Sequence, residues 1–291
     1  MSNENLNFFN KNGYLLIKNC FSEKEVEDLR NKIKIISKNN KKTFLLTSLC
    51  LQEKEIYKTI FNKKLIKVYK DLIQDEVYLV PDLHVQINQF EKNNKDGWHY
   101  DGQSERNNGY LKAYNRKFFR VGIYLQDNSL NYGGGIDILK SNLFKKLPFK
   151  INFLLEKKII SFFSFFFSKT LNSKKGSVVF FDSRLPHKGT FPKKNPTEEA
   201  FFDKYTIYFQ VGNKEHCNYF LKNNIDRTFK GYDKTYVAPY FLDYLKIEFP
   251  NEFPLEFVNM LKTNNINILT LNNDENKFFK EFENFHNNLK K

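Results

Sequence analysis

The stretch EVYLVPDLHVQINQF, residues 76–90, carries the pattern that decides the fold of this chain of 291 residues. From Leu83 to Asn88 apolar and polar residues alternate, and this period of two is typical of a strand with one face in a core. Similar extended runs recur at residues 117–126, 135–140, 176–182 and 204–212. Glycine-containing turn signals at 107–109, 131–135 and 174–177 separate them, so the middle of the chain is predicted to be an antiparallel β-structure.

Helices are predicted on both sides of these strands. After a short strand at residues 14–17, Ser22 and Glu25 have the S-x-x-E spacing of a capping box, and apolar residues at helical spacing follow to Ile36. A second helix is predicted over residues 54–73. We therefore expect a mainly β protein with flanking helices, with a jelly-roll core over about 78–212. Residues 213–291 are predicted to be a mostly helical extension packed on this core, ending in an amphipathic helix over 276–291.

The bulk composition excludes several classes of protein. Three widely spaced cysteines without a CxxC pair indicate neither a disulfide framework nor a zinc finger, and they fit a cytoplasmic protein, as does the lack of an apolar leader. The most apolar window, residues 159–167, is far shorter than the roughly 20 residues of a membrane-spanning helix. The formal net charge of +14 suits anionic partners, although lysines are spread along the whole chain.

The stretch GWHYDGQ, residues 97–103, holds side chains with metal-binding chemistry. It places His99 and Asp101 two positions apart, and His187 lies just past the predicted strand at 176–182, where the mouth of a barrel would place it. Two histidines and one carboxylate can occupy one face of an octahedral metal and leave the other positions open, which suits non-haem iron(II). An ordinary polar turn is the alternative for an H-x-D pair alone, and the position of His187 favours the metal site.

Oxygen activation at such a centre needs two further electrons, which 2-oxoglutarate commonly supplies. Its keto acid end chelates the metal, so its distal carboxylate needs a cation. Lys204, at the start of the last predicted core strand, is the best-placed cation by order along the chain, and Thr190 is a candidate hydroxyl partner. His84 is expected to be a hydrogen-bonded structural residue rather than a ligand.

Four segments resemble the phytanoyl-CoA dioxygenase family of iron(II)- and 2-oxoglutarate-dependent oxygenases, which includes ectoine hydroxylase. They are FFNKNGYLLIKNCFSEKEVEDLRNKI (8–33), WHYD (98–101), LQDNSLNYGGGIDILKSN (125–142) and KKGSVVFFDSRLPHKGT (174–190). The resemblance implies that residues 1–212 form an oxygenase domain built on a double-stranded β-helix. It also implies that His99, Asp101 and His187 bind iron(II), and that Gln86 or Asn88 lies beside the ligands or the co-substrate.

The chain departs from the family pattern at the co-substrate anchor. The family usually has an arginine on the strand that here begins with Lys204, and lysine offers a point charge rather than a bidentate fork. Arg120, within the predicted strand at 117–126, is a rival anchor. Asp101 keeps the carboxylate that related halogenases lack, so the resemblance implies hydroxylation of an unactivated C–H bond, with O2 and 2-oxoglutarate as co-substrates. The substrate is expected to be a small or carrier-linked polar metabolite, and the basic surface favours an anionic one.

Residues 143–175 are predicted to be a lid-like insert rich in phenylalanine and lysine. We expect its phenylalanines to pack on the barrel wall, and the alternative is peripheral contact with an anionic membrane. Two other functions remain for the whole chain: a non-catalytic or membrane-surface binding module on the same fold, and a nucleobase-modifying oxygenase. Because His99, Asp101 and His187 are all present, the sequence argues against a non-catalytic module that has lost its metal site. A paired-arginine strand of the R-x-x-x-x-x-R type is absent from the sequence, so no nucleic acid partner is expected.

Overall fold

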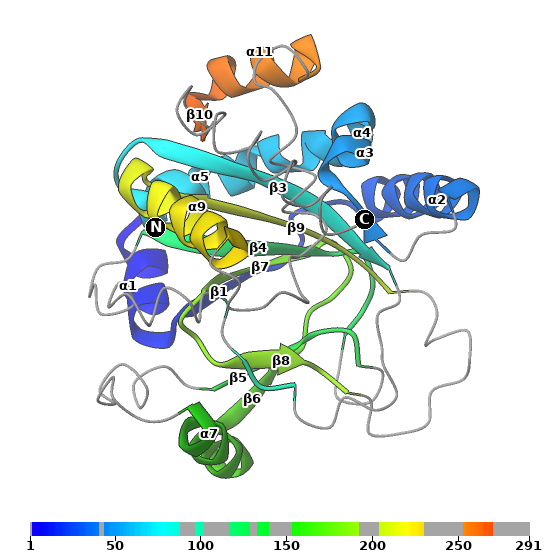
Figure 1. The fold of residues 1–291 in the computed structure, drawn as a ribbon. Coiled ribbons are helices and arrows are strands. Elements are labelled where there is room, and N and C mark those ends of the chain that lie inside the picture. Colours follow the sequence, from blue (N-terminus) through cyan, green and yellow to red (C-terminus); the bar gives the residue numbers. More distant parts are fainter. Residues whose placement is uncertain are drawn as a thin grey trace, which may run out of the picture.

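The structure is a computed structural model that describes residues 2–40, 44–87, 97–99, 101, 117–128, 133–139, 153–191, 204–229 and 253–269. Its strands form two sheets (Figure 1). The larger sheet contains, in spatial order, β1 (Tyr14–Ile17), β7 (Ser177–Asp182), β4 (Phe118–Tyr124), β9 (Tyr205–Gly212), β3 (Val77–Ile87) and β10 (Ile266–Ile268), and β2 (Phe44–Leu45) also pairs with β3. The smaller sheet has the order β6 (Ser168–Leu171), β5 (Ile136–Leu139), β8 (His187–Gly189). The mainly β class with flanking helices is therefore confirmed.

The strand ladders are antiparallel except for β10, which runs parallel to β3. The two sheets face each other, and helices cover the opposite side of the larger sheet (Figure 1). The described helical elements are α1 (Ser2–Asn12), α2 (Glu23–Asn40), α3 (Thr47–Gln52), α4 (Lys54–Tyr57), η1 (Lys58–Phe61), α5 (Lys63–Ile73), α7 (Phe153–Phe167), α9 (Lys214–Phe229) and α11 (Leu255–Asn264).

The alternation of residues along each strand separates two cores. On one face of β4, Val121 and Ile123 belong to the large cluster shared with the helices, because side chains of odd and even positions point to opposite faces. On the other face, Tyr124 packs with Ile138 and Phe181 in a second cluster between the two sheets. Arg120 and Gly122 share this inner face with Tyr124, so the polar site lies between the sheets.

The capping box predicted at the start of α2 is present. The Ser22 hydroxyl donates to Glu25 Oε2 at 2.7 Å and accepts from the Glu25 backbone N–H at 3.3 Å, while the Ser22 backbone N–H also donates to Glu25 Oε2 at 2.7 Å. The apolar face that follows is buried, with Val26 and Ile33 at 1% and 0% exposure. Local chemistry therefore sets the start of this helix, as predicted.

The single helix predicted over residues 54–73 is wrong. The chain forms α4, η1 and α5 there, and the break falls at Asn62, whose ψ of 129° is not helical. The Asn62 side chain accepts a hydrogen bond from the Lys64 backbone N–H at 2.9 Å and so caps α5. Apolar residues on both sides keep a helical period, which is why the periodicity alone did not show the break.

The insert at 143–175 also differs from the expectation. Its last part forms α7 and β6, and β6 is an edge strand of the smaller sheet. Phe162, Phe165, Phe166 and Phe167 are 40–84% exposed, so the prediction that the phenylalanines of this segment pack on the barrel wall is wrong for these four. No helix in the described ranges is long and apolar enough to cross a membrane.

Beyond residue 212 the structure describes α9, α11 and β10, and β10 joins the larger sheet next to β3. Strand β1 joins the same sheet at its other edge, so the larger sheet draws on both sides of the predicted 78–212 core. The division into domains stays a prediction. The predicted turn at 107–109 and helix at 276–291 lie outside the described residues.

Candidate metal centre

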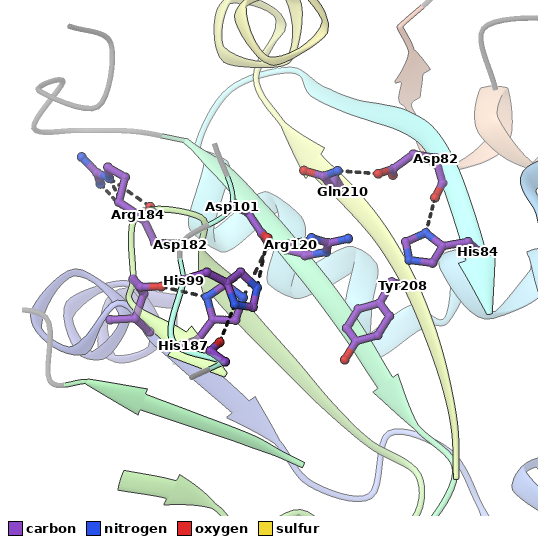
Figure 2. A network of polar contacts seen from close by, with 12 residues as sticks. Asp82, His84, His99, Asp101, Arg120, Asp182, Arg184, His187, Tyr208 and Gln210 are labelled. Carbon is purple, nitrogen blue, oxygen red and sulfur yellow. Dashed lines mark hydrogen bonds and ion pairs between the residues drawn. The ribbon is translucent and has the colours of Figure 1, made fainter. Parts of the chain in front are cut away.

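His99, Asp101 and His187 come together between the two sheets (Figure 2). One candidate ligand atom from each residue lies within 4.8 Å of the others. Asp101 stands between the imidazoles: its Oδ1 is 3.9 Å from His99 Nε2, and its Oδ2 is 3.7 Å from His187 Nε2. His187 is buried, whereas His99 is exposed, so the cluster is reached by solvent from the His99 side.

Backbone pairing brings the two histidines together across 88 residues of sequence. The His99 N–H donates to the His187 carbonyl oxygen at 2.9 Å, and the His187 N–H donates to the His99 carbonyl oxygen at 2.8 Å. His187 is also the residue of β8 that pairs with Ile138 of β5. The register of the smaller sheet therefore fixes the position of His187, and the antiparallel bridge between His99 and His187 fixes His99 beside it.

Both imidazoles are oriented by a carbonyl oxygen two residues earlier in the chain. Nδ1 of His99 lies 2.7 Å from the Gly97 oxygen, and Nδ1 of His187 lies 2.8 Å from the Leu185 oxygen. Because a carbonyl only accepts, each Nδ1 must carry a proton, and in a neutral imidazole this leaves the lone pair on Nε2, the nitrogen nearer Asp101. Metal-binding histidines are oriented in the same way, so the donor set of two imidazole nitrogens and one carboxylate fits iron(II).

Asp101 is ionised because Arg120 lies beside it. The Arg120 Nη1 donates to Asp101 Oδ2 at 2.6 Å, and the two side chains are 13% and 16% exposed. Burial opposes ionisation, but the charge of Arg120 and, at acid pH, the protonated forms of the two histidines outweigh it and hold the pKa of Asp101 well below its usual range. Burial lowers the pKa of His187 to about 4, so at neutral pH this imidazole is neutral and able to bind a metal.

A polar network extends from Arg120 across the inner face of the larger sheet (Figure 2). The Arg120 guanidinium lies 5.4 Å from the centre of the Tyr208 ring, and His84 stacks on that ring at 5.6 Å. His84 Nδ1 in turn lies 2.8 Å from the Asp82 carbonyl oxygen. Burial lowers the pKa of His84 to about 3. His84 thus has hydrogen-bonding and stacking partners in this network, and it is not part of the metal cluster found among the described residues.

Asp82 is the second buried carboxyl of this network. Gln210 donates from its amide Nε2 to Asp82 Oδ2. Burial raises the pKa of Asp82 to about 6, although Arg120 and Gln210 partly oppose the shift. The pKa values of Asp82 and Asp101 are therefore shifted in opposite directions, and Asp101 stays ionised throughout the pH range in which Asp82 titrates.

The Tyr208 ring packs over Gly122, where the lack of a side chain leaves room for it. A Cβ on Gly122 would lie 2.8 Å from Tyr208 Cε1, so the ring covers the backbone of β4 at that position. The Tyr208 hydroxyl is 3.4 Å from that of Tyr124. The sequence reasoning did not single out Tyr208, Gln210 or Asp82. The alternation of Thr206, Tyr208 and Gln210 with apolar residues along β9 was the signal for the first two.

The structure separates the candidate co-substrate residues. Arg120 lies at the metal cluster, whereas Lys204 precedes β9 at the other end of β4, where its Nζ donates to the Asp127 carbonyl oxygen at 3.2 Å. The Thr190 hydroxyl donates to Asp137 Oδ1 at 2.8 Å. Gln86 pairs with Thr206 on the larger sheet and is half-buried. Asn88 lies outside the described residues.

Solved structures share this fold, although no protein-family model and no curated protein sequence matches the chain. HygX from Streptomyces hygroscopicus, with nickel and 2-oxoglutarate bound, has a TM-score of 0.55 at 14% identity over 74% of this chain and 88% of that chain. EctD from S. alaskensis with bound Fe has a TM-score of 0.54 at 13% identity over 74% and 78%. The epimerase SnoN with Fe3+, alpha ketoglutarate and nogalamycin RO has 0.53 at 10% identity over 73% and 83%.

At these identities the similarity shows the fold alone. The predicted jelly-roll class is confirmed, and the fold is shared with structures that hold iron or nickel and 2-oxoglutarate. The site adds a cluster of His99, Asp101 and His187 whose candidate ligand atoms lie within 4.8 Å of one another. Membership of the phytanoyl-CoA dioxygenase family is not shown by these comparisons.

Proposed function

We propose that this protein is a non-haem iron(II)- and 2-oxoglutarate-dependent oxygenase of the phytanoyl-CoA dioxygenase type. The observation that carries the proposal is the geometry of His99, Asp101 and His187. Both Nε2 atoms face one carboxylate within 4 Å, and both Nδ1 atoms are held by carbonyl oxygens. Iron(II) bound there would supply the Lewis acidity and redox chemistry of oxygen activation.

The proposed reaction converts substrate C–H, O2 and 2-oxoglutarate into substrate C–OH, succinate and CO2. One oxygen atom enters the new hydroxyl group and the other enters succinate, so the oxidation of 2-oxoglutarate supplies the two remaining electrons. Asp101 and the two histidines hold the metal, and Arg120 keeps Asp101 ionised and oriented. The apolar cluster of Tyr124, Ile138 and Phe181 meets the site at His187, whose ring lies 4.8 Å from that of Phe181, and it would exclude water on this side of a bound metal.

Lys204 is the proposed anchor for the distal carboxylate of 2-oxoglutarate. Its rival Arg120 donates to the carboxylate of Asp101 at 2.6 Å, and Lys204 Nζ donates to the Asp127 carbonyl oxygen at 3.2 Å. Lys204 is only 8% exposed, and a buried cation attracts a carboxylate more strongly than an exposed one. The Thr190 hydroxyl would have to turn away from Asp137 in order to donate to the co-substrate.

The proposed reaction is hydroxylation, and the proposed substrate is a polar, anionic metabolite. Asp101 supports hydroxylation, because the carboxylate occupies the position that a halide would need. The structurally similar SnoN is described as an epimerase, so inversion of a stereocentre without oxygen insertion is the competing outcome on this fold. Turnover under 18O2 separates the two: a hydroxylase product gains one labelled oxygen, whereas an epimerised product gains none.

The metal site is tested by anaerobic titration with iron(II), followed by tryptophan fluorescence. Trp98 is the only tryptophan of the chain and precedes His99, so metal bound at the cluster is expected to quench it. Asp101→Ala and His187→Ala should remove saturable quenching. His216→Gln is the matched control, since this buried histidine contacts Asn213 and lies outside the cluster. Equal quenching in wild type and Asp101→Ala, with both folded by circular dichroism, would overturn the proposal.

A further inference from the structure

Helix α7 presents an apolar surface that the fold does not cover. Phe162, Phe165, Phe166 and Phe167 are 65%, 84%, 62% and 40% exposed. They are four of the seven large apolar side chains that are exposed among the described residues, and all four lie within six consecutive positions. Soluble monomers rarely keep a contiguous apolar patch of this kind unless it binds something.

The rings of this surface contact mainly one another. Phe162 and Phe166 have centroids 5.6 Å apart, and those of Phe165 and Phe166 are 5.1 Å apart. The opposite side of the helix is anchored, since Ile160 is only 4% exposed and α7 contacts β5 and β6. The helix therefore lies against the smaller sheet (Figure 1), while its phenylalanine rings at 162 and 165–167 are exposed to solvent.

The net charge of the sequence segment that contains α7 indicates which kind of partner its exposed rings would bind. Residues 140–175 contain nine lysines and a single acidic residue, Glu156, which gives this segment a net charge of +8. That is more than half of the +14 of the whole chain in about an eighth of its length. A sequence segment rich in both lysine and phenylalanine has the composition of helices that lie in the interface of anionic bilayers.

Two observations favour a bilayer over a second copy of this chain. A symmetric dimer through α7 would bring two segments of charge +8 together, and like charges across an interface oppose association. The helix also has 15 residues, about 22 Å at 1.5 Å per residue, which is too short to span a bilayer and long enough to lie along its surface.

We propose that α7 docks this protein on the surface of anionic membranes, with Phe162, Phe165 and Phe166 inserted below the headgroups, and that the net positive charge of this sequence segment favours anionic lipid. Helix α7 continues directly into β6, which pairs with β5, and β5 pairs with the strand that carries His187. The metal cluster is thus held at a fixed distance from the bilayer. A substrate presented at the membrane, such as a lipid-linked polar molecule, fits this arrangement.

The test is co-sedimentation of the full chain with vesicles at 150 mM salt, using pure phosphatidylcholine and phosphatidylcholine with about 30% phosphatidylglycerol. The variant is Phe165→Ser together with Phe166→Ser, which leaves all lysines in place. Leu255→Ser is the matched control, because Leu255 is 75% exposed on α11, far along the chain from α7. Size-exclusion chromatography with light scattering, without lipid, reports self-association.

The proposal expects wild type and Leu255→Ser to sediment with the anionic vesicles, and the double variant to partition about thirty-fold more weakly. Wild type that stays in the supernatant with anionic vesicles would overturn it. Equal sedimentation of wild type and the double variant would also overturn it, because binding would then rest on charge alone. A dimer that dissociates in the double variant, without lipid binding, would assign the surface to a second copy instead. None of these readouts depends on iron or on catalysis.

Discussion

The Arg120–Asp101 pair offers a quantitative test of the site without metal. Arg120 Nη1 and Asp101 Oδ2 are 2.6 Å apart, and the side chains are 13% and 16% exposed. Exposed ion pairs contribute about 0–1 kcal/mol, whereas removal of one partner from a fully buried pair costs about 3–5 kcal/mol. This pair lies close to the buried limit, so we expect a coupling free energy of about 2–3 kcal/mol.

The coupling is measured with a double-mutant cycle of Arg120→Ala, Asp101→Ala and the double variant, by urea unfolding in the presence of a chelator. Arg120→Ala should cost much less in the Asp101→Ala background than in wild type, because the stranded charge is then gone. Arg30→Ala serves as the control: Arg30 donates to the Leu125 carbonyl oxygen, so its effect should add to that of Asp101→Ala. A coupling below about 0.5 kcal/mol between Arg120 and Asp101 would refute the buried pair.

Two further predictions concern stability elsewhere in the fold. Gly176→Ala should lower the free energy of unfolding by about 2–4 kcal/mol, because Gly176 has φ +77° and a Cβ there would lie 2.6 Å from a backbone oxygen; Gly189→Ala, with nothing within 4 Å, should change it by less than about 0.5 kcal/mol. The pKa of Asp82 is raised to about 6, so the folded protein holds a proton that the unfolded chain releases near pH 4. Wild-type stability should therefore fall by about 2–3 kcal/mol relative to Asp82→Asn as the pH rises from about 4 to 6. Parallel pH profiles for the two proteins would contradict this assignment.

The sequence predicts much of the fold wherever local chemistry decides the structure. The alternation from Leu83 to Ile87 and the capping box of Ser22 and Glu25 both correspond to observed elements. The sequence did not predict the break at Asn62, because the apolar residues on both sides keep a helical period and this pattern hides the capping role of the asparagine. The strands β6, β8 and β10 have three or four residues each, too few for a period of two to stand out, and they form through pairing with distant strands.

The candidate ligands were predictable, but their surroundings were not. An H-x-D pair and a later histidine are visible in the sequence, and the structure brings His99, Asp101 and His187 together. Which cation lies beside the carboxylate depends on where the segment that bridges His187 through His99 lies relative to β4, so the role of Arg120 beside Asp101 emerges only in three dimensions. The exposure of the phenylalanines in α7 is likewise a property of packing that composition does not reveal.

The central claim is that this cluster binds iron(II) together with 2-oxoglutarate. It is tested most directly by adding 2-oxoglutarate to anaerobic protein that contains one equivalent of iron(II), and recording the weak visible charge-transfer band of the chelate. We predict a saturable band in wild type, no band in Asp101→Ala, and a higher 2-oxoglutarate concentration for half-saturation in Lys204→Ala. A correctly folded wild-type protein without the band, or an undiminished band in Asp101→Ala, would contradict the claim.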